Sequence, residues 1–357
     1  MKKIVVVGGG AGGLELVTRL SKTLGKRKLA EVILVDRSRT HVWKPLLHEV
    51  AAGVINKASD GVDYRMHAAQ HQYQFQLGNM SYIDRDNQSI YLDPLYDEDG
   101  LEILPERTVE YDYLVMAIGS ITNDFGTLGV SEHCYCLDSL IQAERFHRAL
   151  LNQLLKINQE GVTKKKIHVA IVGAGATGTE LAAQLHHVSN LARAYGMPEM
   201  SADKLQVSIL EAGPRILPAL PERIAGSARR ALTKLGIEVH ENTRVQRVDK
   251  EGFVTAEDVL IEADLMVWSA GVKAPEFLTD LNLFELNKAN QILVTPALQS
   301  TVDNKIFAIG DCCGVLQKDG SWVPPRAQSA HQMASLLAKN LQNLFMHKPM
   351  QAYTYTD

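Results

Sequence analysis

The sequence predicts an α/β protein built from two doubly wound units, and two observations support this fold class. A short apolar strand runs into the glycine-rich loop at residues 8–13, and a second runs into a like loop at residues 173–178. Each loop is followed by a helical pattern and then by an acidic strand end, Asp36 or Glu211. One GxGxxG loop is weak evidence, but two complete copies predict two nucleotide-binding βαβ units.

The loop glycines are the candidate phosphate-contacting residues. Because they lack side chains, a pyrophosphate can approach the backbone amides at the positive N-terminal end of the following helix. A chain that binds two dinucleotides in this way most often passes electrons between them. The candidates are Gly8, Gly10 and Gly13 in the first loop and Gly173, Gly175 and Gly178 in the second.

The acidic residues that close the second strand of each unit are candidate ribose ligands. Asp36 and Glu211 each follow a buried apolar run and can accept hydrogen bonds from ribose hydroxyls. At Glu211 a carboxylate favours NAD, because it repels the 2′-phosphate of NADP. Arg215 lies four residues further on and leaves NADP open on sequence grounds.

Each half of the chain also contains an apolar strand that ends in small residues, over 111–120 and over 263–271. Small residues let the backbone approach a ligand closely. Short strands and hairpins are expected over 75–118, a long helix over about 140–158 and a further buried strand over 304–311. The candidate ligand-facing residues at the two strand ends are Ala117 and Gly119, and Ala270 and Gly271.

Composition excludes several classes of protein. The chain has 357 residues, of which 46% are hydrophobic, enough for two domains with a core each. A net charge of −4 predicts no nucleic-acid partner. No apolar run reaches the roughly 18 residues of a membrane span, and the N-terminus does not resemble a secretory signal, so a cytoplasmic protein is expected.

The four cysteines predict no metal site. Cys134 and Cys136, and the adjacent Cys312 and Cys313, have neither zinc-ligand spacing nor nearby histidines. The simplest interpretation of the adjacent pair is two small buried hydrophobic residues.

Taken together, these motifs resemble the two-dinucleotide flavoprotein oxidoreductases, and within them the type II NADH:quinone oxidoreductases. The general likeness rests on GGGAGG with Asp36, YDYLVMAIGS, GAGATG with Glu211, and IFAIGD with Asp311. The narrower likeness covers essentially the whole chain and rests on residues 41–53, 178–181, 268–274 and the AQSAHQ stretch at 327–332, the most specific of the four.

The resemblance implies a glutathione-reductase-like architecture with two Rossmann-like domains, the NADH domain inserted into the FAD domain. FAD would be bound by residues 1–118 and 291–346, and NADH by residues 119–290. Residues 347–357 would begin a C-terminal segment that docks on the membrane. The alternating pattern over residues 353–357 predicts the start of a strand. The implied location is the cytoplasmic face of the inner membrane, and a homodimer is left open.

The resemblance also assigns roles around non-covalently bound FAD. Lys44 and Pro45 would line the flavin, and Asp311 would hydrogen-bond the ribityl chain. A helix starting near Pro325, with Ala327 among the cofactor-binding residues, would direct its positive N-terminus at the flavin ring.

Four further residues are candidates for the chemistry. The family likeness places Glu180 near the nicotinamide, although from the residues alone a first-turn glutamate is also explained by the helix dipole. Gln328 and Gln332 are four residues apart and share one helix face, so both amides could bind quinone carbonyls. His331 would relay a proton. The implied reaction passes two electrons from NADH through flavin to a membrane quinone.

Two other functions are left open by the sequence. One is a soluble NADH-dependent flavoprotein reductase of a ferredoxin- or rubredoxin-type protein, and the other is an NADH-binding redox sensor. Thiol–disulfide chemistry is excluded, because related disulfide reductases carry a cysteine pair in the segment that residues 41–53 occupy, and this segment contains no cysteine.

Overall fold

The computed structural model describes residues 1–54, 61–160, 166–194 and 204–356, and the chain forms two compact units. The first unit consists of Met1–Trp43, Gly61–Ile121 and Val272–Asp357. The second consists of Lys44–Asp60 and Thr122–Gly271. The prediction of an α/β protein with two Rossmann-like units is confirmed.

The bounds of these units differ from the predicted domain boundaries mainly in two segments, and residues 119–121 and 347–357 also group with the first unit. Residues 44–60 group with the second unit, because α2 (Leu47–Ala52) packs against α6 (Leu140–Glu160) and α7 (Ala176–Ala194) of that unit. Residues 272–290 group with the first unit, because Ala274 and Leu278 lie in its hydrophobic core. Which unit binds which dinucleotide stays a prediction.

The first unit is built on a five-stranded parallel sheet with the strand order β23-β11-β1-β2-β5. The short strand predicted at Phe75–Leu77 is present, and it lies at one edge of this sheet, where it pairs in parallel with β2. The sheet and its connecting helix comprise β1 (Lys2–Val7), α1 (Ala11–Leu20), the π-helical turn η1 (Ser21–Gly25), β2 (Ala30–Asp36), β5 (Gln74–Leu77), β11 (Tyr113–Met116) and β23 (Ile306–Ala308).

The second unit repeats this plan with the strand order β13-β20-β14-β15-β16. Ile167 pairs with Leu205 at the start of the second unit's central strands, just as Lys2 pairs with Ala30 in the first unit. Its elements are α5 (Val130–His133), β13 (Cys134–Tyr135), α6 (Leu140–Glu160), β14 (Ile167–Val172), α7 (Ala176–Ala194), β15 (Leu205–Leu210), α8 (Glu222–Lys234), β16 (Glu238–His240) and β20 (Leu265–Trp268).

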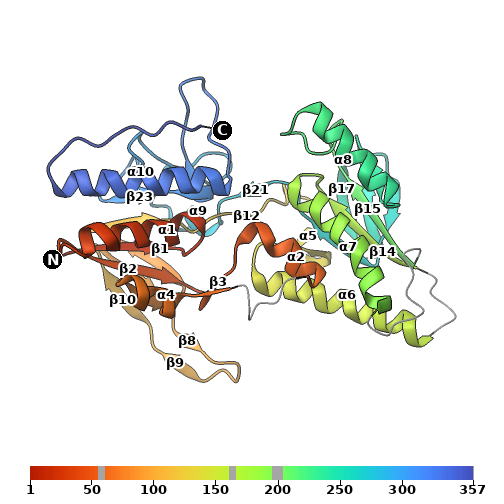
Figure 1. The fold of residues 1–357 in the computed structure, drawn as a ribbon, viewed down its shortest axis with the longest axis horizontal. Helices are drawn as coiled ribbons and strands as arrows, with labels where there is room; N and C mark the ends of the chain where they lie inside the picture. The colour runs from red at the N-terminus through yellow and green to blue at the C-terminus, as the bar shows by residue number, and fades with distance from the viewer. Residues whose placement is uncertain (55–60, 161–165, 195–203, 357) are drawn as a thin grey trace. The chain divides into compact units, whose positions relative to one another are not determined.

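Each unit adds a small antiparallel sheet, as the hairpin pattern predicts. These are β10-β7-β6 in the first unit and β17-β18-β19 in the second. The β8–β9 hairpin extends away from the sheets of the first unit (Figure 1). The strands are β6 (Met80–Asp84), β7 (Ser89–Leu92), β8 (Leu95–Tyr96), β9 (Glu102–Leu104), β10 (Arg107–Glu110), β17 (Val245–Asp249), β18 (Gly252–Thr255) and β19 (Leu260–Glu262).

The long helix α10 (Ala327–Phe345) packs beside α1 in the first unit (Figure 1). It begins two residues after Pro325, with Arg326 as its N-cap. The remaining elements are β3 (Thr40–His41), η2 (Lys44–Leu46), β4 (Val62–Asp63), α4 (Tyr64–His71), β12 (Ile121–Thr122), β21 (Val272–Lys273), α9 (Phe277–Leu281), β22 (Ile292–Leu293), η4 (Gly310–Cys312) and β24 (Cys313–Gly314).

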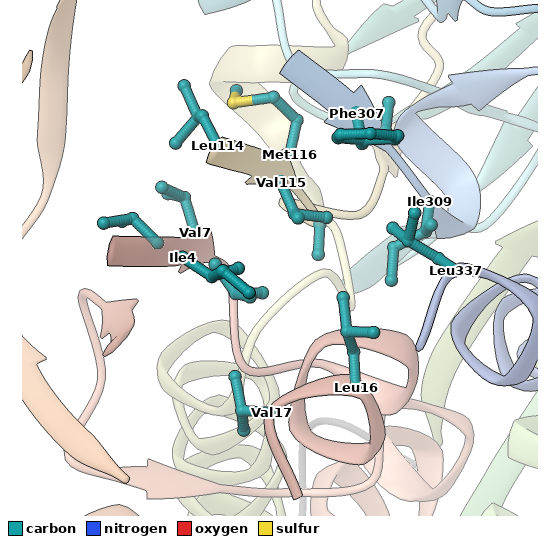
Figure 2. Packing of buried hydrophobic residues seen from close by; sticks show 14 of the residues in the cluster. Ile4, Val7, Leu16, Val17, Leu114, Val115, Met116, Phe307, Ile309 and Leu337 are labelled. Atoms are coloured by element: carbon teal, nitrogen blue, oxygen red, sulfur yellow. The ribbon is translucent and has the colours of Figure 1, made fainter. Parts of the chain in front are cut away.

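The core of the first unit lies between its parallel sheet and the helices α1 and α10 (Figure 2). Continuous apolar runs form the central strands because both faces of a parallel sheet are covered. The helices contribute side chains at helical spacing, which gives each one a single buried stripe. The residues labelled in Figure 2 are Ile4 and Val7 of β1, Leu16 and Val17 of α1, Leu114, Val115 and Met116 of β11, Phe307 and Ile309, and Leu337 of α10.

The C-terminal residues do not begin a strand, contrary to the prediction from their alternating pattern. No regular element is present over the described residues 351–356. The backbone N–H of Tyr353 instead donates to Pro296 O at 2.7 Å, and its ring packs on the core of the first unit. A backbone group that binds a loop carbonyl in this way needs no neighbouring strand.

The glycine-rich loops turn so tightly that the backbone itself excludes side chains. Gly173 has φ +100°, and a Cβ on Gly178 would lie 2.0 Å from Gly173 O. The first loop is the same, because a Cβ on Gly13 would lie 1.9 Å from Gly8 O. Such contacts are far inside van der Waals distance, so the third glycine of each loop is needed for the fold itself.

We expect Gly178→Ala to lower the free energy of unfolding by about 2 kcal/mol, because the new methyl group would force the loop off α7. Urea unfolding measures this loss. Gly175→Ala is the matched control, since a Cβ on Gly175 would meet no atom within 4 Å. Equal stability of the two variants would contradict this account of the loop.

Candidate active site

Each glycine-rich loop is tied to the acidic residue predicted to bind a ribose. In the first unit Asp36 Oδ2 accepts a hydrogen bond from Gly9 N at 2.6 Å, and Oδ1 accepts one from Ser38 N at 2.7 Å. Glu211 makes the equivalent pair in the second unit, with Ala174 N at 2.9 Å and Gly213 N at 2.8 Å. The carboxylates are therefore fixed at the loops, and each oxygen keeps a lone pair for a further donor.

The space in front of both helices fits the phosphates of a dinucleotide. A Cβ on Gly10 or on Gly175 would meet no protein atom within 4 Å. The first helical hydrogen bonds run from Leu14 N to Gly10 O and from Thr179 N to Gly175 O, so the amides before them face the loop. Neither helix carries an acidic residue in its first turn. Free amides and a positive helix end are the donors that a pyrophosphate requires.

Arg215 does not extend toward a 2′-phosphate site. Its guanidinium donates to Pro218 O at 2.9 Å and to Leu220 O at 2.8 Å, and so holds the loop that follows β15. Of these two side chains, Glu211 is the one bound to the glycine-rich loop, and the preference for NADH stays a prediction.

In the first unit, the small-residue strand end lies directly under its loop. A Cβ on Gly8 would lie 2.3 Å from Ala117 O, and Gly119 has φ +72°. The buried Ser120 donates its hydroxyl to Asp311 Oδ2 at 2.7 Å, so the predicted ribityl ligand is oriented by this strand end. The chain thus brings Asp311 to the same edge of the sheet as the loop.

The second unit has a matching strand end under its own loop. A Cβ on Gly173 would lie 2.7 Å from Ala270 Cα, and the Ser269 hydroxyl contacts Val172 O at 3.0 Å. Gly271 has φ +66° and is exposed. The backbone of Ala270 therefore lies against the second loop, whereas the Phe125 ring lies beside Gly271, where a Cβ would be 2.6 Å from its Cζ.

Gln328 and Gln332 share one face of α10, as their spacing predicts. Both side-chain amides donate to Thr356 O, at 3.3 Å and 2.6 Å. Gln332 Oε1 also accepts from Thr356 N at 3.2 Å and from the Tyr353 hydroxyl at 3.3 Å. The chain's own C-terminal residues thus engage the two amides that were predicted to bind a quinone, and Gln332 is the more fully occupied of the two.

His331 forms a charged cluster that the sequence did not reveal. Its Nδ1 lies in very short contact with Glu15 Oε2 on α1, and its ring stacks on Trp43 with centroids 5.5 Å apart. Arg19 and Ser335 also reach the Glu15 carboxylate, at 2.7 Å and 3.2 Å. Burial pushes the pKa of Glu15 up, but hydrogen bonds with His331 and Arg19 outweigh it and hold the pKa below its ordinary value. His331 is therefore oriented by a carboxylate.

This cluster lines an open cavity of about 710 Å³ in the first unit. The walls come from α1, from α10 and from the C-terminal residues 352–356. Glu15, His331 and Gln332 all face the cavity. The predicted quinone-binding glutamine and the predicted proton relay thus border one space.

Glu180 occupies a different position on its helix from the one predicted. It is the fifth residue of α7, and the first turn of that helix contains no acidic residue. It therefore does not complement the helix dipole as a first-turn glutamate would, because that effect fades beyond the first turn. Its side chain is 55% exposed and lies 3.6 Å from the ring of His48.

His48 is a functional candidate that sequence reasoning missed. Its side chain is 7% exposed, and among the described residues its Nδ1 finds no hydrogen-bond partner. A buried unpaired ring nitrogen costs about 1–3 kcal/mol. The likeness over residues 41–53 contained His48 but gave it no role, and no local pattern distinguishes it from a packed histidine.

Lys44 and Pro45 begin the η2 turn and are both exposed. They group with the second unit, whereas Trp43 just before them groups with the first. Their predicted contact with the flavin stays a prediction.

The cysteines are not reactive thiols. Cys312 and Cys313 are fully buried, as predicted, and burial raises the pKa of Cys312 to about 12. Burial also raises the pKa of Cys134 to about 12 and that of Cys136 to about 11. Thiolates are the reactive form, so these residues are unsuited to redox exchange near neutral pH.

The described helices include none that is long and apolar enough to cross a membrane.

The chain has two glycine-rich loops, each hydrogen-bonded to a strand-end carboxylate, an arrangement typical of dinucleotide-binding oxidoreductases. A family model described as pyridine nucleotide-disulphide oxidoreductase matches residues 2–334, and the chain belongs to this family. Along its whole length it is 44% identical to a type II NADH:quinone oxidoreductase of Haemophilus influenzae, 84% of which it covers. It is 27% identical to the enzyme of that name from a Staphylococcus aureus strain, 86% of which is covered.

Solved structures show the same fold at lower identity. NDH2 from Plasmodium falciparum, solved with NADH, matches 96% of this chain with a TM-score of 0.83 at 20% identity, over 83% of its own length. A sulfide:quinone oxidoreductase from Aquifex aeolicus matches 98% of this chain and 78% of its own, with a TM-score of 0.76 at 18% identity. The predicted membership in the two-dinucleotide flavoproteins is confirmed.

We expect Glu15→Gln to lower the free energy of unfolding by about 1–2 kcal/mol at neutral pH, because it removes the charged partner of His331 and Arg19. The native pKa lies below the ordinary value of 4.5, so the contribution is present above 4.5 and is lost as the pH falls through the native value. The free energies of unfolding of wild type and variant, measured with urea from neutral to acid pH, should therefore converge at acid pH. Ser335→Ala is the control, since it leaves His331 and Arg19 in contact with Glu15 and should keep most of the pH dependence of the wild type.

Proposed function

We propose that this chain is a non-pumping NADH:quinone oxidoreductase that uses FAD, with two electrons passing from NADH to a quinone. The observation that supports this most is the repeated loop, strand-end acid and bare strand end, present once in each unit. The 44% identity to a type II NADH:quinone oxidoreductase supports the choice of donor and acceptor.

In this proposal the first unit holds FAD. The amides that precede Leu14 would bind its pyrophosphate, Asp36 its adenosine ribose, and Asp311 its ribityl chain from a position set by Ser120. When bound, FAD supplies a ring that takes up a hydride and gives up electrons to a quinone. The N-terminus of α10, which has no acidic residue in its first turn, lies next to η4 and would favour negative charge there.

The second unit would hold NADH in the matching way. The α7 amides would bind the pyrophosphate, and Glu211 would accept hydrogen bonds from the ribose. Ala270 and Gly271 would let the nicotinamide approach the backbone. Glu180, one turn further along α7, would position the nicotinamide end of the molecule.

The quinone would lie against α10. Gln332 and Gln328 already bind carbonyl oxygen through their amide nitrogens, and a quinone carbonyl is an acceptor of the same kind. His331, held by Glu15, would supply a proton to the reduced quinone. Respiratory quinones are dissolved in the membrane, so the proposal includes peripheral attachment to the cytoplasmic face of the inner membrane. It also allows a homodimer.

Anaerobic titration tests this function. The purified protein should contain one FAD, NADH should bleach it, and a water-soluble quinone should restore the colour. Gln332→Leu should raise the KM for the quinone by about tenfold, because one hydrogen bond to the quinone is lost. Bleaching of the flavin by NADH should stay intact. Gln342→Leu is the control on the same helix, since Gln342 only bonds Ala338 O within α10.

Other results would favour the functions left open by the sequence. Preference for a ferredoxin over the quinone would indicate a soluble reductase. Slow turnover with a persistent NADH complex would indicate a sensor. A colourless protein that cannot be reconstituted with flavin would overturn the proposal.

We expect Glu211→Gln to weaken the preference for NADH over NADPH about tenfold, because the repulsion of a 2′-phosphate is lost while the side-chain shape is kept. Dissociation constants for both nucleotides measure this. Arg215→Met should leave the preference unchanged, since Arg215 binds Pro218 O and Leu220 O. A loss of NADPH affinity in Arg215→Met would show that the arginine reaches the nucleotide.

A further inference from the structure

A buried histidine points an unused ring nitrogen at the candidate carboxylate of the second unit. Nδ1 of His48 lies 3.6 Å from Oε2 of Glu180, and both residues belong to that unit. The imidazole is buried, whereas the glutamate side chain is 55% exposed. A rigid donor thus lies next to a mobile acceptor, at a distance slightly longer than a hydrogen bond.

Packing fixes the position of this imidazole. α2 contacts both α6 and α7 and ends at Gly53, whose φ of +78° ends the helix. From α6, His147 places its Nδ1 3.3 Å from Ala51 O, one turn beyond His48. A small rotation of the Glu180 side chain is therefore the easier way to close the gap.

The charged groups around His48 come from two elements. Glu49 of α2 has its Oε1 3.9 Å from Nε2, and Glu180 of α7 has its Oε2 3.6 Å from Nδ1. Each ring nitrogen thus faces one carboxylate, with the nearer one across the helix interface. The hydrogen bond that one nitrogen makes sets the tautomer of the ring.

We propose that His48 is a positioning residue for Glu180: its Nδ1–H donates to Oε2 and holds the exposed carboxylate in one orientation when NADH is bound. This rests on the proposed function, which places Glu180 at the nicotinamide end of NADH. Hydrogen bonds of catalytic groups are often long in the free protein and shorten in the complex. The 3.6 Å separation fits that behaviour.

If His48 only stabilised the fold, replacing it would lower the free energy of unfolding, and the surroundings of the ring indicate otherwise. An apolar residue of similar volume would fill the same space without an unpaired nitrogen, so the fold gains nothing from the imidazole. His48→Leu should therefore unfold at the same urea concentration as wild type or at a higher one. A defect in that variant would then report on Glu180 and not on stability.

A double-mutant cycle tests the inference. His48→Leu, Glu180→Gln and the double variant are compared in two measurements, the dissociation constant of NADH by fluorescence titration and the rate at which NADH bleaches the flavin. We expect each single change to weaken NADH binding about fivefold and to slow bleaching. The double variant should be no worse than Glu180→Gln, since residues that act through one contact are not additive.

Two conservative variants serve as matched controls. The amide nitrogen of Asn takes the place of Nδ1, so His48→Asn should restore NADH binding to within about twofold of wild type. The amide nitrogen of Gln takes the place of Nε2 and faces Glu49, so His48→Gln should remain defective. Unfolding midpoints of all variants show whether each is folded.

Three results would overturn the inference. They are additive effects in the double variant, a folded His48→Asn protein as defective as His48→Leu, or a Glu180→Gln protein that matches wild type and so leaves nothing to position. Failure of the proposed function would be seen separately, as a wild-type protein that NADH does not bleach or that does not reduce a quinone.

Discussion

The structure depends on one constraint that occurs twice: a glycine-rich loop lies in backbone contact with the ends of three parallel strands. In each unit the second loop residue donates its amide to the strand-end carboxylate, at 2.6 Å for Asp36 and 2.9 Å for Glu211. The third glycine contacts the carbonyl of the first at a distance that excludes any Cβ. The loop, the acid and the following helix are thus one rigid element, and the ligand-facing atoms are arranged before any ligand binds.

This constraint divides the electrostatic roles cleanly. The strand-end carboxylate uses one lone pair of each oxygen on the backbone and keeps the others for hydroxyl donors. The helix N-terminus carries no acidic residue and keeps its amides for phosphate oxygens. The negative carboxylate and the positive helix N-terminus therefore lie on either side of the same loop. Because Glu211 and Arg215 are both held by backbone groups, the positions of these two charges are set by the fold.

Outside the loops, the chemistry depends on pairs of residues that are far apart in the sequence. Glu15 orients His331 from another helix, and His48 faces Glu180 across the α2–α7 interface. In both cases a carboxylate and an imidazole meet at an edge of the packed helices. Residues 41–53 contain no cysteine and supply His48 to the second of these pairs.

The sequence by itself determined the fold class, the two nucleotide loops with Asp36 and Glu211, the small-residue strand ends and the shared face of Gln328 and Gln332, because each is a local pattern whose geometry follows from strand or helix period. Tertiary structure decided which residues that are distant in the sequence lie next to one another, because local spacing carries no information on such contacts. It placed Phe75–Leu77 at the edge of a parallel sheet and residues 272–290 in the first unit. It also placed Thr356 O within hydrogen-bonding distance of the Gln328 and Gln332 amides. It also paired Glu15 with His331 and His48 with Glu180, since such contacts arise only when distant helices pack and bring their side chains within hydrogen-bonding reach.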